Sequence, residues 1–128
     1  SLLVLSGCGT QETPQSSSLS DVHTCASVPV GKIDESKKSQ YQAIAQARAD
    51  GMARYNYFGN GHDVDRRYPD VPAKPRNVAE GTGWSTSPLP STCYFTGAVI
   101  ADAVARSHSG RYYRVRFFNG GRYIGVRR

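Results

Sequence analysis

The 128-residue chain has no long run of apolar residues. A helix that crosses a bilayer needs roughly 20 such residues in succession, and the apolar run at residues 2–5 is too short for that role. The chain also has no Cys-x-x-Cys pair and no Cys/His cluster, which argues against a structural zinc site. A Ser/His/Asp order, a phosphate-binding glycine loop and a pair of catalytic carboxylates are missing as well. None of the common enzyme signatures therefore stands out.

Acidic residues and lysine are missing from the last part of the chain. From Arg106 to Arg128 there are seven arginines, no lysine and no acidic residue, within a net charge of +6. Five of these arginines are candidates for binding a polyanion, namely Arg114, Arg116, Arg122, Arg127 and Arg128. Outside the cytosol such a partner is a lipid head group or a wall polymer rather than nucleic acid. The alternative is a solvated strand face that happens to be basic.

A short segment near the start resembles a bacterial lipobox, the signal for lipidation of a cysteine. Leu5-Ser6-Gly7-Cys8 follows the apolar residues Leu2-Leu3-Val4 and precedes a polar stretch. We interpret residues 1–7 as the end of a signal peptide and Cys8 as the lipidated residue. This interpretation predicts an extracytoplasmic protein that a lipid anchors to a bacterial membrane, in the periplasm or at the cell surface. A buried strand at residues 2–5 is the alternative.

The number of cysteines is odd. Three are present, and lipidation of Cys8 would leave Cys25 and Cys93 as a pair. An exported compartment is oxidising enough for a disulfide, so we expect these two residues to be linked. Two unpaired buried thiols are the alternative.

The remainder of the chain divides into a tether and one domain. Residues 8–24 are rich in Ser, Thr, Gln and Pro and are expected to form a flexible tether. Residues 25–128 are enough for one domain with a core. The expected elements are a docking strand at 26–32, a main helix at 34–57 with Asp34 as N-cap, a second helix at 96–107, and two strands at 111–118 and 122–128 that form a hairpin through Asn119-Gly120-Gly121.

Three stretches of the domain point to a known family. Residues 47–58 are similar to a first helix that runs into an Asn-x-Phe turn, and residues 77–84 are similar to a Gly/Ala-Glu-Asn-Ile segment. Residues 99–126 are similar to a helix, a Ser-Pro-Gly-His-Arg turn and a Val-Gly-Val-Gly strand. In this order, over residues 36–128, they resemble the bacterial branch of the CAP superfamily, the cysteine-rich secretory, antigen 5 and pathogenesis-related proteins. The resemblance implies an α+β fold, an α–β–α sandwich with a small antiparallel sheet that here lacks its usual last strand.

The resemblance also implies a cleft, which in the family often holds two His and two acidic residues. Such a ligand set suits zinc, and its Glu can serve as a general base. Glu80 matches the family's Glu, whereas the His positions fall on Asn60 and Gly110. The nearest histidines, His62 and His108, each lie two residues away. The cleft candidates are Asn60, His62, Glu80 and His108, with no match for the second acid.

Three functions are consistent with these patterns. The first is an envelope module that holds a lipid, glycan or peptide without catalysis or cofactor. The second is a metal-dependent hydrolase with Glu80 as base and His62 and His108 as zinc ligands. The third is a basic tether that grips an anionic surface of the envelope. We expect the first, with weak or no binding of zinc, because the ligand set is incomplete.

Overall fold

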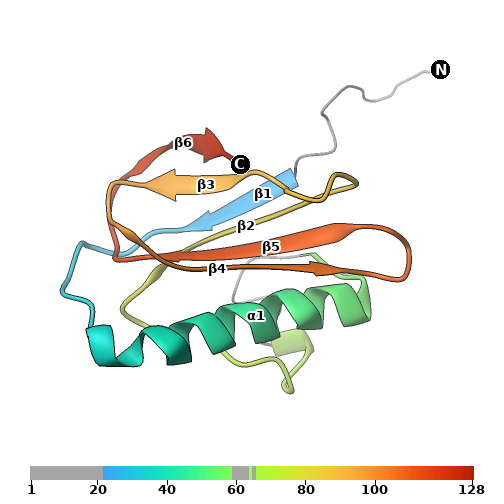
Figure 1. Ribbon diagram of the computed structural model, residues 1–128, viewed down its shortest axis with the longest axis horizontal. Coiled ribbons are helices and arrows are strands. Elements are labelled where there is room, and N and C mark those ends of the chain that lie inside the picture. Colours follow the sequence, from blue (N-terminus) through green and yellow to red (C-terminus); the bar gives the residue numbers. More distant parts are fainter. Residues whose placement is uncertain (1–21, 59–63, 65) are drawn as a thin grey trace.

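The computed structural model describes residues 22–58, 64 and 66–128. These residues form a mixed α+β fold, as predicted, with one long helix and six strands (Figure 1). The elements are β1 (Val22–Ala26), the 3-10 helix η1 (Glu35–Lys37), α1 (Lys38–Tyr55), β2 (Ala79–Ser85), β3 (Thr92–Phe95), β4 (Val99–Arg106), β5 (Tyr112–Phe118) and β6 (Tyr123–Arg127).

The long helix forms where the sequence predicted it. Asp34 has extended backbone, and its carboxylate accepts a hydrogen bond from the backbone N–H of Ser36 at 3.0 Å, so it caps η1. The helix α1 follows directly and ends at Tyr55. Asn56 then adopts the left-handed conformation, with φ 48°, that commonly ends a helix. The start of η1 and the end of α1 are thus set by local chemistry. Asp34 was predicted as the N-cap of the long helix, but the N-cap of α1 is Lys37, which makes no side-chain capping bond.

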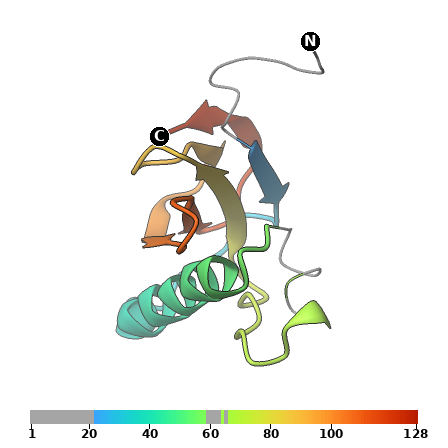
Figure 2. The same ribbon diagram turned by 90° about the vertical axis from the view of Figure 1, so that its right-hand side faces the viewer.

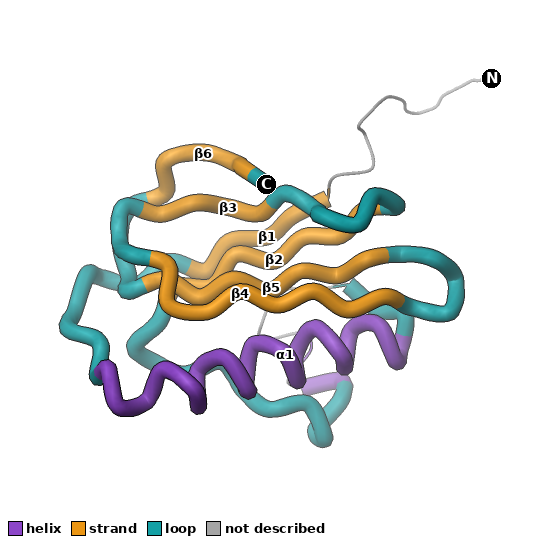
Figure 3. The backbone as a smooth tube through the Cα atoms, in the orientation of Figure 1, coloured by secondary structure: helices purple, strands orange, loops and turns teal. Residues whose placement is uncertain are grey.

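The strands form two antiparallel sheets, with the orders β1-β2-β5-β4 and β3-β6. On β5, Tyr113, Val115 and Phe117 belong to the hydrophobic core that includes α1, whereas the alternate residues point to the other face of the sheet. The helix covers one face of the larger sheet and the small sheet lies over the other (Figures 1 and 2). The layers are therefore helix, sheet and sheet, as the backbone tube also shows (Figure 3). In the described part of the chain, the small sheet takes the place of the second helical layer that an α–β–α sandwich requires.

Residues 99–106 form strand β4, so the helix predicted at 96–107 is wrong. The error has a physical reason, a bulge in the pairing with β5 between Val99 and Ala101. The bulge places the consecutive residues Ile100 and Ala101 in buried positions, together with Ala103. Apolar residues spaced in this way imitate the pattern of an amphipathic helix.

The strands β5 and β6 form as predicted, but the prediction that they pair as a hairpin is wrong. Strand β6 pairs with β3 instead of β5. Gly120 and Gly121 have positive φ, at 64° and 117°, and the N–H of Gly121 donates a hydrogen bond to the carbonyl of Val28 at 2.8 Å. These two glycines lead the chain past residues 28–29 and on to the second sheet.

The docking strand predicted at 26–32 lies earlier, at Val22–Ala26. The last residues of the tether predicted at 8–24 are thus part of the larger sheet. The lipidation candidate Cys8 and residues 1–7 lie outside the described residues.

Candidate functional site

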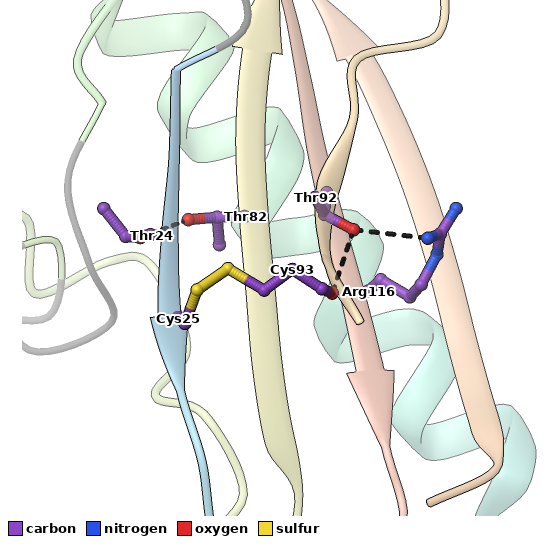
Figure 4. Close-up of a disulfide and its surroundings, with 6 residues drawn as sticks. All are labelled: Thr24, Cys25, Thr82, Thr92, Cys93 and Arg116. Carbon is purple, nitrogen blue, oxygen red and sulfur yellow. Dashed lines mark hydrogen bonds between the residues drawn. A yellow bond between two sulfur atoms is a disulfide. The ribbon is translucent and has the colours of Figure 1, made fainter. Parts of the chain in front are cut away.

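The cysteine pair predicted from the odd count is linked. Cys25 on β1 and Cys93 on β3 form a disulfide, with Cα atoms 5.7 Å apart and 68 residues between them in sequence (Figure 4). Cys93 is completely buried, whereas Cys25 is exposed. The disulfide therefore joins the edge of the larger sheet to the small sheet.

Two glycines on β2 let the small sheet approach this closely. Gly81 is the register partner of Cys25, and a β-carbon on Gly81 would lie 2.6 Å from the carbonyl oxygen of Cys93. A β-carbon on Gly83 would collide with the carbonyl oxygen of Ser91. The disulfide itself crosses β2 (Figure 4). The sequence analysis used residues 77–84 only for the family resemblance and missed the packing role of these two glycines.

Glu80 lies in the core and not in a cleft. Its carboxylate accepts two hydrogen bonds from Arg48 of α1, from Nε at 2.7 Å and from Nη2 at 3.3 Å, and both side chains are 2% exposed. Arg48 also donates from Nη1 to the carbonyl of Pro72 at 2.6 Å. Because the guanidinium occupies both carboxylate oxygens, Glu80 connects β2 to α1 as a buried bidentate ion pair. Arg48 lies on the same helix face as the buried residues Tyr41, Ala45 and Met52, and a charged residue on such a face is the sequence signal that could have found this pair.

The histidine that could join Glu80 lies at the far end of the sheet. Glu80 pairs with Phe117 of β5, whereas His108 lies in the turn between β4 and β5, beyond Tyr112. The strand from Phe117 to Tyr112 spans roughly 16 Å. The prediction that Glu80 and His108 share one cleft is therefore wrong.

The other cleft candidates give no metal centre in the described part of the chain. Asn60 and His62 lie outside the described residues. His108 lines a hollow together with Asp50, Arg54 and Arg106. Across residues 22–58, 64 and 66–128, no three His, Cys, Asp or Glu side chains are grouped so that they could hold a metal ion.

Two of the five candidate arginines are buried, so the prediction that they bind a polyanion is wrong. Arg114 donates to both carboxylate oxygens of Asp102, at 2.8 and 2.6 Å. Arg116 donates from Nε to Asp102 at 3.3 Å and from Nη1 to the hydroxyl of Thr92 at 3.3 Å. Asp102 is on β4, next to β5 in space and distant in sequence. The sequence analysis considered only acidic residues close to the arginines along the chain and therefore missed Asp102.

The other three candidates, Arg122, Arg127 and Arg128, are exposed. No carboxylate of the described residues forms an ion pair with them. The guanidinium carbon of Arg127 lies 5.0 Å from the centre of the Tyr94 ring, and that of Arg116 lies 4.6 Å from the same centre. These exposed arginines remain available for a partner at the edge of the small sheet.

Aromatic and charged side chains also cluster at the C-terminal end of α1. The rings of Tyr55 and Tyr68 stack with centres 3.9 Å apart, and the carboxylate of Asp70 accepts hydrogen bonds from the Tyr55 hydroxyl and from Arg54. The hydrogen bond from Tyr55 lowers the pKa of Asp70 and raises the pKa of Tyr55. The cluster fastens the segment after the helix to the end of α1.

Comparison with protein-family models, with curated proteins and with solved structures gave no match for this chain. Its function is therefore inferred from the geometry of the chain itself. Within the described ranges, no helix has the length and apolar character needed to cross a bilayer. The two features that bear on a proposal of function are the disulfide between the sheets and the basic outer edge of the small sheet.

Proposed function

We propose that this chain is an exported, lipid-anchored module of the bacterial envelope that binds or holds a partner without catalysing a reaction. The observation that carries the proposal is the disulfide between Cys25 and Cys93. Structural disulfides persist in oxidising compartments and are rare in the cytosol. The pairing also leaves Cys8 as the single remaining cysteine, in the lipobox-like segment where lipidation requires one.

The absence of catalysis is supported by the state of Glu80. A general base must offer a carboxylate oxygen to a water molecule or a substrate, and both oxygens of Glu80 accept hydrogen bonds from the buried Arg48. The alternative function, a zinc hydrolase, needs Glu80 and the two histidines together. Membership of the CAP superfamily and its α–β–α sandwich stay predictions, and the proposed function does not depend on them.

The lipid anchor is tested by fractionation of cells that express the chain behind a complete export signal. The unchanged protein is expected in the membrane fraction after a wash in high salt. Cys8→Ala is expected in the soluble fraction, while the control Ser18→Ala, in the same polar stretch, stays with the membrane. A Cys8→Ala protein that still sediments with membranes in high salt contradicts the lipoprotein interpretation.

The absence of a zinc-dependent activity is tested by calorimetric titration of the purified chain with zinc. We expect no tight stoichiometric binding. Tight binding that is lost in both Glu80→Gln and His108→Ala would support the hydrolase instead. Binding that is unchanged in both variants would place zinc elsewhere in the chain.

A further inference from the structure

The outer edge of the small sheet exposes large apolar side chains. On β6, Tyr123 is 50% exposed, Ile124 43% and Val126 37%. Val30, 63% exposed, lines an open hollow beside this strand together with Arg122. Single exposed apolar residues are normal, but a cluster marks an interaction site. We call the exposed side chains of residues 122–128 the β6 surface.

The β6 surface carries positive charges and no acidic side chain. Arg122 precedes the apolar residues of β6 and Arg127 and Arg128 follow them, and none of the three pairs with a carboxylate of the described residues. The acidic residues in the described ranges lie elsewhere, at Asp34, Glu35, Asp50, Asp70, Glu80 and Asp102. Strand β6 and helix α1 lie on opposite sides of the larger sheet in both ribbon views (Figures 1 and 2). The β6 surface is thus uniformly positive.

We propose that the β6 surface lies on an anionic phospholipid membrane. The three arginines contact lipid phosphates, and the side chains of Tyr123 and Ile124 enter the head-group region. The inference deepens the proposed function, on which it rests, by naming the partner of the anchored module. It also assigns a role to those candidate arginines that are not buried.

The apolar residues favour a membrane over a soluble polyanion. A wall polymer in water can neutralise the arginines but leaves Tyr123, Ile124 and Val126 exposed to solvent. A bilayer surface accommodates both kinds of side chain, because phosphates lie next to a zone where apolar and aromatic groups are stabilised. A mixture of arginine, tyrosine and aliphatic residues therefore matches a lipid interface better than a charged polymer.

Two features of β6 disfavour an added protein strand as the partner. The pairing of β6 with β3 is irregular between Tyr94 and Phe95, and Gly125 has a φ of 138°, which interrupts the regular strand. Arginines also flank the strand at both ends. Irregular pairing and charge are common means by which an edge strand avoids pairing with another chain.

The strand at which the described chain begins suits this orientation. The disulfide ties β1 to β3, so the chain enters the larger sheet at the strand joined to the small sheet. Cys8 precedes β1 in the sequence. A lipid on Cys8 would therefore hold the domain near the bilayer at a high local concentration, and a weak β6 surface would be sufficient to orient it.

The test is sedimentation of the full chain carrying Cys8→Ser, which has no lipid, with vesicles of phosphatidylglycerol and phosphatidylcholine. We expect binding at low salt that weakens toward physiological salt, because exposed charges are then screened over about 8 Å. Each arginine near an anionic surface contributes about a fivefold gain, so combined Arg122→Gln, Arg127→Gln and Arg128→Gln should weaken binding on the order of a hundredfold. Tyr123→Ser with Ile124→Ser should weaken it several-fold.

The matched control removes the same charge elsewhere, with Lys37→Gln, Arg76→Gln and Arg106→Gln, and should keep binding nearly unchanged. Leu89→Ser, at another exposed apolar residue, serves as the control for Tyr123→Ser and Ile124→Ser. Circular dichroism and an intact disulfide confirm that each variant is folded. The substituted side chains are exposed, so their replacement should not disturb the core.

Several outcomes would overturn the inference. One is an absence of binding to anionic vesicles at low salt, and another is equal weakening by the control triple variant. Equal binding to pure phosphatidylcholine vesicles would show that the negative charge of the lipid is not recognised. Binding to soluble polyphosphate that matches vesicle binding, and that ignores Tyr123→Ser with Ile124→Ser, would identify a polymer as the partner. Since the assay uses unlipidated chain, none of these results decides whether Cys8 is lipidated.

Discussion

The carbonyl oxygen of Cys93 occupies space that a side chain on Gly81 would need. A β-carbon on Gly81 would lie 2.6 Å from this oxygen and 3.1 Å from the Cys93 nitrogen. Gly81 also lies opposite Cys25 in the ladder between β1 and β2. One glycine thus lies between the two half-cystines and allows the small sheet to pack against the larger one.

Replacement of Gly81 by alanine should destabilise the domain. The new methyl group overlaps backbone atoms of β3, which cannot move without disturbing the disulfide, so we expect a loss of about 1–3 kcal/mol in the free energy of unfolding. Urea unfolding under oxidising conditions measures it. The control is Gly31→Ala, where no atom lies within 4 Å of the added β-carbon and φ is not in the left-handed region. Equal stability of the two variants would contradict this packing.

Removal of the disulfide should lower stability by a larger amount. The crosslink spans 68 residues, and a loop of this length corresponds to roughly 4 kcal/mol of chain entropy in the unfolded state. Cys25→Ser is the preferred change because Cys25 is exposed, whereas Cys93 is buried. Its urea midpoint should match that of the unchanged protein in reducing agent. If reducing agent leaves the midpoint of the unchanged protein where it was, the crosslink does not stabilise the fold.

Replacement of either Arg48 or Glu80 should lower the free energy of unfolding strongly. Arg48→Met leaves a buried carboxylate without its partner, and Glu80→Leu leaves a buried guanidinium, so each change should cost about 3–5 kcal/mol. The double variant should lose much less than the sum, because no uncompensated charge remains. A double-mutant cycle by chemical denaturation measures this coupling. Additive losses would show that the two side chains act independently.

The contribution of Asp34, the cap of the 3-10 helix η1 in front of α1, to stability should depend on pH. Hydrogen bonds from the hydroxyl and the N–H of Ser36 lower the pKa of Asp34 below its ordinary value of 3.8. A carboxyl group with a lowered pKa in the folded state stabilises the fold above its unfolded pKa, and this contribution disappears as the pH falls through the folded pKa. Asp34→Asn retains capping but cannot titrate.

The measurement compares the melting temperatures of the unchanged protein and Asp34→Asn between pH 6 and pH 2. The difference in melting temperature in favour of the unchanged protein should stay constant down to the ordinary pKa of 3.8 and decrease below it. A difference that stays constant over the whole range would rule out a contribution from the ionisation of Asp34.

Part of this structure follows from local sequence signals. Asp34 and the apolar spacing behind it predicted α1, because a cap and a helical face involve residues only a few positions apart. The alternation in β5 predicted a strand for the same reason. The disulfide was predicted from the cysteine count and the inferred compartment, without knowledge of the distance between Cys25 and Cys93.

The rest was decided by contacts between distant segments. Residues 99–106 carry a pattern that fits a helix or a bulged strand, and only the pairing of β4 with β5 selected the strand. The turn Asn119-Gly120-Gly121 before strand β6 suits a hairpin with β5, yet β6 pairs with β3.

The tertiary structure also decided which charges are available to a partner. Arg48 and Arg116 are buried because they meet Glu80 and Asp102, carboxylates that the sheet and the helix bring to them from other parts of the chain. The sequence by itself determined where helix α1 and strand β5 form and that the last part of the chain is rich in arginine. Burial and ion pairing depend on which segments pack together, and the packing sets the free energy of each charge.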